Sequence, residues 1–291
     1  MAVSMRDIKR KITSIQKTQQ ITKAMKMVAA AKLRKTQDAA LIFKPYITKL
    51  EQMIGSLVSS TSRQDNKMLL FRDVKSVDVI VITSDRGLCG AFNHNVLKET
   101  ENFIKNKLQG KDVNLVLIGR FAYNYFKFRG IQPKETYTDV LKDKADYSLA
   151  SDIMDKVIAD FLDEKSDEAY IVYNRFVNVL VQKPTIKRVL PIYIGDTVPS
   201  EKGMVEKFDF EPDKETVLDE LLPKYVKMEL YGSMLESLAG EYAARMTAMD
   251  AATNNAAEMI KTLTLEFNKA RQASITKELI EITTSIEAMK Q

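Results

Sequence analysis

The feature that most constrains the fold is an unbroken row of mostly apolar or small residues near the C-terminus. Its spacing predicts a helix that packs along a partner helix in a coiled coil. We expect this helix to run from about Asp213 to Met289, about 115 Å at about 1.5 Å per residue, with a break at Pro223. The row steps alternately by four and three residues through Tyr242, Met246, Met249, Thr253, Ala256, Ile260, Leu263, Phe267, Ala270 and Ser274.

The N-terminal segment predicts the partner helix. From Ser4 to Ser59 the only glycine is Gly55 and the only proline is Pro45, where a kink is expected, and good helix formers dominate. A first seam and a neighbouring row that takes over from it are expected. The first comprises Ile8, Ile12, Ile15, Gln19 and Thr22, and the second Ile21, Met25 and Val28.

Charge indicates that the two ends pair. Residues 1–50 hold twelve Lys or Arg and two acidic residues, a balance of +10, whereas residues 212–291 hold nine and thirteen, a balance of −4. We therefore expect the two terminal helices to lie against each other in antiparallel orientation. The alternative, a core face in an ordinary helical bundle, would need a third long helix, and the middle of the chain is too β-rich to supply one.

The basic N-terminal stretch leaves a second function class open. Its cations could follow the phosphates of a nucleic acid, although the stretch has no aromatic residue for base stacking before Phe43. An acidic protein surface or an anionic lipid would also suit this charge. The residues are Lys9, Arg10, Lys11, Lys17, Lys23, Lys26, Lys32, Arg34 and Lys35.

Between the long helices the periodicity changes to that of strands. Short β-branched runs, each followed by a turn and a helix-compatible segment, are typical of βαβ units and a largely parallel sheet. We expect strands at 77–83, 113–118, 170–181 and 186–194, a helix at 146–164 and a linker at 195–212.

The predicted fold class is α/β, with a long antiparallel two-helix coiled coil formed by the N- and C-terminal helices and an inserted Rossmann-like α/β domain. The domain boundaries expected are 1–59 for the first coiled-coil helix, 75–195 for the α/β domain and 213–291 for the second helix.

No catalytic or cofactor site is expected. The chain lacks both G-x-x-x-x-G-K-[ST] and G-x-G-x-x-G, the common phosphate-binding loops, so we expect no bound nucleotide and no cofactor. One cysteine, Cys89, and one histidine, His94, are too few for a Cys/His zinc site. A nucleophilic thiolate at Cys89 is the weaker interpretation, because a lone cysteine beside apolar residues is more often packed. No apolar run of about 18 residues is present, so no membrane-spanning helix is expected.

Several stretches resemble the γ subunits of F-type ATP synthases, in the same order along nearly the whole chain. Residues 5–35 (MRDIKRKITSIQKTQQITKAMKMVAAAKLRK) are similar to the family's N-terminal helix and residues 84–93 (SDRGLCGAFN) to its loop after the first strand. Residues 170–191 resemble its later strands, and residues 237–282 its C-terminal helix. After Glu281 the chain departs from the family, which tends to have small residues there.

The resemblance implies a rotor shaft without a catalytic site, which couples rotation of a membrane ring to ATP chemistry on other subunits. The implied partners are the α and β subunits, whose ring surrounds the coiled coil, the ε subunit and the membrane c-ring, with acidic β-subunit loops facing the basic helix. The absence of a regulatory cysteine pair suggests a bacterial form, peripheral on the cytoplasmic face of the cell membrane. Positions that match the family's coupling and partner contacts are Met25, Arg245, Arg271, Gln272, Thr276 and Glu278.

Overall fold

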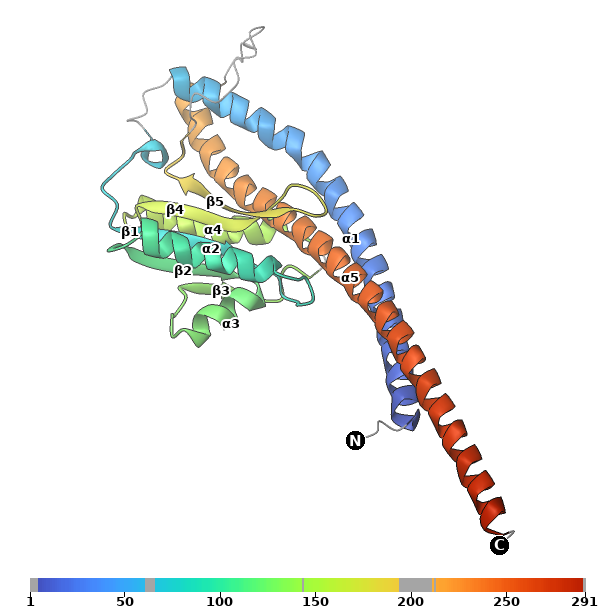
Figure 1. Ribbon diagram of the computed structural model, residues 1–291. Helices are drawn as coiled ribbons and strands as arrows, with labels where there is room; N and C mark the ends of the chain where they lie inside the picture. Colours follow the sequence, from blue (N-terminus) through green and yellow to red (C-terminus); the bar gives the residue numbers. More distant parts are fainter. Residues whose placement is uncertain (1–4, 61–65, 143, 194–210, 212, 290–291) are drawn as a thin grey trace. The chain divides into compact units, whose positions relative to one another are not determined.

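A computed structural model of the protein describes residues 5–60, 66–142, 144–193, 211 and 213–289 (Figure 1). Two long helices, α1 (Met5–Ser60) and α5 (Lys214–Ala288), enclose in sequence a segment of strands and shorter helices. The chain divides into two compact units. Met1–Ala29 and Met246–Gln291 form one, here called the helical unit, and Ala30–Arg245 form the other, the mixed unit.

In the helical unit, α1 and α5 run antiparallel. Lys26 Nζ lies 2.6 Å from Asp250 Oδ1, and Thr253 Oγ1 donates a hydrogen bond of 2.8 Å to Thr22 Oγ1. From Lys26 to Thr22 the sequence number on α1 falls, while that of the partner on α5 rises from Asp250 to Thr253, as expected for antiparallel helices. The heptad row from Met246 onward is buried or half-buried along its length, while most residues between its members are exposed. The predicted antiparallel coiled coil is confirmed.

The predicted shift of the α1 seam is wrong. Ile21 and Val28 are largely exposed, whereas Thr22 and Ala29 are buried. The seam keeps its first row because Thr22 finds a hydroxyl partner on α5 and because the small side chain of Ala29 lets the helices approach closely. Met25, which the prediction also placed in the second row, is half-buried.

The sheet of the mixed unit has five strands in the order β3-β2-β1-β4-β5. The first four are mutually parallel, and β5 pairs antiparallel with β4. This mostly parallel sheet with crossover helices confirms the Rossmann-like prediction. The strands are β1 (Ser76–Ile82), β2 (Asp112–Ile118), β3 (Glu135–Tyr137), β4 (Glu168–Phe176) and β5 (Gln182–Leu190).

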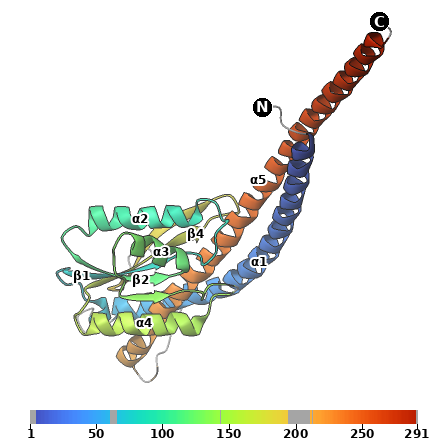
Figure 2. The same cartoon turned by 90° about the horizontal axis from the view of Figure 1, so that it is seen from below.

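Helices cover both faces of the sheet (Figure 2). One face packs against α2 (Phe92–Lys107) and α3 (Arg120–Phe128). The other packs against α4 (Tyr147–Leu162) and against the parts of α1 and α5 that belong to this unit. Because successive side chains of a strand point to opposite faces, β1 contributes Val79 to the first core and Ile80 to the second.

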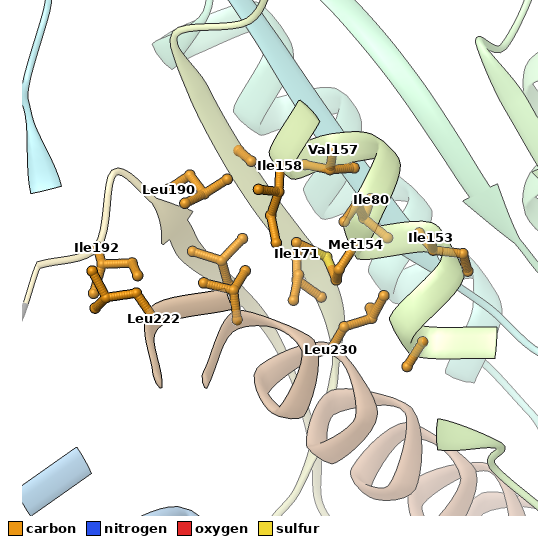
Figure 3. Close-up of a cluster of buried hydrophobic side chains, with 14 of the residues drawn as sticks. Ile80, Ile153, Met154, Val157, Ile158, Ile171, Leu190, Ile192, Leu222 and Leu230 are labelled. Atoms are coloured by element: carbon orange, nitrogen blue, oxygen red, sulfur yellow. The ribbon is translucent and has the colours of Figure 1, made fainter. Parts of the chain in front are cut away.

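The larger core attaches α5 to the sheet (Figure 3). Ile80 and Ile171 from the strands meet Met154 from α4 and Leu222 and Leu230 from α5. All five side chains are almost completely inaccessible to solvent. Burying side chains of this size contributes about 1.5–3 kcal/mol each, so this stretch of α5 is an integral part of the domain core.

Three details differ from the predictions. Residues 177–181 form a turn between β4 and β5, so the predicted strand to residue 181 is too long, and the next strand begins before its predicted start. Pro223 lies inside α5 without ending it, since buried Leu222 and Val226 hold the helix on both sides. The short strand β3 and a 3₁₀ turn (η1, Lys67–Leu69) were not predicted, being too brief to show a period.

The linker predicted at 195–212 lies almost entirely outside the described residues. Within the described part of the chain, no helix is both long enough and apolar enough to cross a membrane.

Candidate functional site

The predicted site residues fall in two separate places. Met25, Arg271, Gln272, Thr276 and Glu278 belong to the helical unit. The remaining residue, Arg245, is the last residue of the mixed unit.

The last third of α5 and the residue that follows the helix carry an exposed apolar row, here called the tip face. Its members step by four, three, four and three residues and are between 49% and 85% exposed. That spacing keeps them on one side of the helix. The tip face consists of Ile275, Leu279, Ile282, Ile286 and Met289.

Four predicted site residues border the tip face. At about 100° of rotation per residue, Arg271 and Glu278 lie along one side of it, and Gln272 and Thr276 along the other. All four are exposed. Thr276 Oγ1 donates to the carbonyl oxygen of Gln272 at 2.9 Å, and Ser274 Oγ donates to Glu278 Oε1 at 3.3 Å. The result is an apolar stripe with polar and charged margins.

The described part of α1 does not reach the tip face. Met5 lies seventeen residues before Thr22, so the observed register places it opposite Ala270, seventeen residues after Thr253. Beyond that point the described chain offers α5 no coiled-coil partner. An apolar row that long on an unpaired helix marks an interaction surface.

Met25 lies elsewhere in the helical unit. It is half-buried on α1 near the level of Asp250, the partner of Lys26. About twenty residues of α5 separate that level from Arg271, which is about 30 Å at 1.5 Å per residue. The exposed apolar side chains of Met27 and Val28 adjoin it in sequence. Met25 and the tip face therefore lie at two separate levels of the helical unit.

The side chain of Arg245 forms its ion pair and its hydrogen bonds within the mixed unit. Its side chain is 11% exposed, and its Nη1 lies 2.7 Å from Glu241 Oε1, one helical turn away. Nη2 donates to the carbonyl oxygens of Arg86 and Gly87, both at 3.1 Å, in the loop after β1. The structure thus places Arg245 inside the mixed unit, with its donors occupied by carbonyls and a carboxylate.

Buried titratable groups surround this loop. Burial raises the pKa of Glu241 to about 7, a shift that the Arg245 guanidinium opposes and the charge of Asp85 reinforces. Asp85 accepts hydrogen bonds from the backbone N–H groups of Arg120, Asp139 and Leu141. These bonds hold together the loops at the carboxyl ends of the strands. Sequence reasoning missed Glu241, because only its spacing of four residues from Arg245 indicates the Glu241–Arg245 ion pair.

Cys89 belongs to the same loop, and its side chain is buried. Burial raises the pKa of its thiol, although the charge of Arg245 and a hydrogen bond with Ser84 oppose the shift. Asn93 Nδ2 donates to Cys89 Sγ at 3.4 Å, while His94 is exposed. A thiol with a raised pKa is a poor nucleophile at neutral pH, so the packed interpretation of Cys89 holds. Among the described residues, no group of three or more His, Cys, Asp or Glu could hold a metal ion.

The fold and the exposed tip face of α5 together define a class of protein. Its members are subunits of a larger assembly that contact the other subunits through a long helix. A family model described as ATP synthase matches residues 4–289. The ATP synthase gamma chain of Heliobacterium modesticaldum is 44% identical over 290 residues, covering 98% of this chain and 99% of that protein. The same-named protein of Pelotomaculum thermopropionicum is 43% identical over 289 residues, covering 99% of both. The chain belongs to the ATP synthase gamma chain family.

Solved structures agree with this fold. The rotor of the Euglena gracilis mitochondrial ATP synthase matches with a TM-score of 0.68 at 20% identity, covering 93% of this chain and 98% of that one. The central stalk of the Tetrahymena thermophila mitochondrial enzyme matches with a TM-score of 0.62 at 23% identity, covering 80% and 99%. Family membership confirms the function class predicted from the sequence, and the nucleic-acid alternative receives no support from these matches.

Proposed function

We propose that this chain is the central shaft of an ion-driven ATP synthase and transmits rotation without catalysing a reaction itself. The observation that carries the proposal is the tip face, an apolar stripe on an unpaired helix with polar margins. Such a stripe is suited to turning inside a collar of other subunits, since apolar contacts have no fixed direction and can slide. The polar margins supply directional contacts that distinguish one angle from another.

The partners we propose are the α and β subunits around the helical unit, and the ε subunit and the membrane c-ring beside the mixed unit. The relatives are named ATP synthase gamma chains, and a second Euglena gracilis structure with this fold is an assembly of F1 and the c-ring. On this proposal the chain is held at the cytoplasmic face of a bacterial cell membrane through its partners, and the transported ion is the proton. The domain boundaries we propose remain 1–59, 75–195 and 213–291.

The residues proposed as coupling or partner contacts to the surrounding subunits are Met25, Arg245, Arg271, Gln272, Thr276 and Glu278. Arg271 is the sharpest test among them, because its guanidinium can hold a carboxylate or carbonyl pair with directional hydrogen bonds. Loss of such a contact costs about 1.5–3 kcal/mol at the angle where it forms. The helix itself should survive Arg271→Ala, since alanine is the better helix former.

The test uses a tagged chain purified from its own cells with the whole complex. We expect α, β and ε subunits and c-ring protein to co-purify, and the isolated chain to show no ATPase activity. In membrane vesicles, Arg271→Ala should lower ATP-driven proton pumping per ATP hydrolysed while the amount of assembled complex stays the same. Lys277→Ala is the matched control, because it removes a cation from the opposite side of the same helix.

If the tagged chain co-purified with none of the ATP synthase subunits, the proposal that it is the central shaft would be wrong. Normal assembly together with equal pumping ratios in the Arg271→Ala and Lys277→Ala complexes would assign Arg271 to the solvated surface.

A further inference from the structure

The turn between β4 and β5 exposes three apolar side chains to solvent. This hairpin tip comprises residues 177–181, and Figure 1 shows it as the turn that joins these two strands. Leu180 is 81% exposed, and Val177 and Val181 are each about half exposed. Loops are normally polar, so three exposed aliphatic side chains at one turn indicate a surface that another molecule covers.

The tip is held in one conformation. Asn178 Oδ1 accepts hydrogen bonds of 2.9 Å from the backbone N–H groups of both Leu180 and Val181. Gln182 Nε2 donates to the carbonyl oxygen of Val179 at 3.0 Å. The backbone N–H of Val177 donates to the carbonyl oxygen of Val181 at 3.2 Å. A rigid apolar tip loses little conformational entropy when it docks.

Two cations stand directly behind the tip. Arg175 on β4 is the register partner of Lys183 on β5, and both are exposed. Residues two apart on a strand share a face, so Arg175 lies on the face of Val177 and Lys183 on that of Val181. Like charges directly opposite each other destabilise a strand pair. Neither cation forms an ion pair with a carboxylate of the described chain.

Nearby acids offset the charge of this pair only in part. The sequence has no Asp or Glu from Ala169 to Tyr193. Glu236 of α5 faces Arg175, whose charge opposes the rise that burial causes in the pKa of that carboxyl. Glu229 is already paired with Lys187. The exposed surface behind the tip is therefore basic.

We propose that the hairpin tip docks on an acidic protein segment of another subunit of the same complex, one that presents an apolar surface flanked by carboxylates. The proposal rests on the proposed function, which places the chain among other subunits. Leu180 and the two valines supply the apolar contact. Carboxylates of the partner relieve the repulsion between Arg175 and Lys183, so the pair is more stable in the complex than in the free chain.

A protein fits this surface better than the other anionic partners. Membrane recognition by charge takes clusters of about four to eight Lys or Arg, and only two cations stand at this tip. A single-stranded nucleic acid would be expected to stack its bases on aromatic side chains, and the tip has none. One acidic segment can match both the cations and the aliphatic side chains.

The test places a photoreactive p-benzoylphenylalanine at position 180 in the full chain and irradiates the purified complex. We expect one major cross-linked product, to a protein subunit, whose linked peptide contains Asp or Glu. The same probe at Gln109 is the control, an exposed position in the turn before β2, at the amino end of that strand, whereas the hairpin tip follows the carboxyl end of β4. It should not give that product.

A second comparison separates specific docking from mere proximity. With the probe at 180, the double change Arg175→Glu and Lys183→Glu should lower the cross-link yield by at least about tenfold, because like charges would then face each other across the contact. Lys107→Glu, an exposed charge reversal elsewhere, should leave the yield unchanged. Yields are normalised to the amount of assembled complex, which excludes variants that fail to fold.

A complex that contains the ATP synthase subunits but gives no protein adduct at position 180 would overturn the docking proposal and leave the shaft intact. So would a lipid or nucleic-acid adduct, or a yield insensitive to the charge reversal. Failure of the chain to co-purify with those subunits would overturn the shaft itself.

Discussion

Arg245 holds Gly87 by two hydrogen bonds to one carbonyl oxygen, from Nε at 3.3 Å and from Nη2 at 3.1 Å. The bonds attach α5 to the loop after β1 at the last residue of the mixed unit. The next residue in the loop, Leu88, is exposed and adopts a positive φ of 63°, which few non-glycine residues tolerate without support. Arg245 therefore supports the conformation of this loop.

Arg245→Ala should expose Cys89. The change removes the bonds that close the loop over this thiol and leaves Glu241 buried without its cation. A loss of about 1.5–3 kcal/mol would speed the reaction of Cys89 with a disulfide reagent by roughly ten- to a hundredfold. Cys89 is the only thiol of the chain, so the absorbance of the released thiolate reports on this loop alone.

Arg245→Lys should give an intermediate rate, because one ammonium cannot reach the carboxylate and both carbonyls. Arg271→Ala, an exposed arginine on the same helix, should leave the rate unchanged. An unaltered rate in Arg245→Ala would show that other contacts close the loop.

Glu241 should make stability fall as pH rises. Its pKa is about 7 in the folded chain and near 4.5 when unfolded, so the folded state binds the proton more tightly between those values. The contribution present below about pH 4.5 is lost as pH rises through about 7, and amounts to about 3 kcal/mol at about 1.4 kcal/mol per unit. In urea titrations at about pH 5 and pH 8, Glu241→Gln should weaken this dependence, and the exposed Glu278→Gln should not. Equal slopes in wild type and Glu241→Gln would contradict the assignment.

The sequence predicted what depends on periodicity. The heptad row of α5 and the buried strand β1 repeat often enough to define which side of each element faces its neighbours, so their partners could be foreseen. The shifted row through Ile21 and Val28 failed because apolar content was taken as the criterion for burial. A hydroxyl pair at Thr22 and Thr253 decides the seam, and only the structure shows which polar residues meet across two helices.

The site was only partly predictable. The family resemblance supplied four residues that border the tip face, and it implies a contact with other subunits for these and for Arg245, which stays a prediction in each case. A resemblance carries residue identity without the hydrogen bonds that use up the donors of a side chain. The tip face itself could have been found in the sequence, since Ile275, Leu279, Ile282 and Ile286 keep the coiled-coil spacing on a row shifted by one residue from Ser274.

Cysteines at positions 22 and 253, with Cys89 changed to serine, should form an intramolecular disulfide. The two hydroxyl oxygens are 2.8 Å apart, so the replacement sulfurs would need only a small approach. The product should migrate as a monomer on non-reducing gels and shift on reduction. Pairing position 253 with exposed Ser14 is the mismatched control, two turns of α1 away, and should give no intramolecular bond. Intermolecular bridges from the 22/253 pair would contradict a coiled coil made by a single chain.

Ile282→Asp should damage coupling more than any exposed substitution on the opposite side of α5. If the tip face is enclosed by other subunits, the change buries a carboxylate among apolar groups, which costs several kcal/mol unless a partner compensates it. Thr284→Asp introduces the same charge about 200° around the helix, off the tip face. Both side chains are exposed in the free chain, so neither variant should lose helix content by circular dichroism. The measurement is the yield of assembled complex and its ATP-driven proton pumping: Ile282→Asp should lower one or both, and Thr284→Asp should lower both less. Equal behaviour of the two variants would mean that the tip face stays in water, and the stripe from Ile275 to Met289 would then need another explanation.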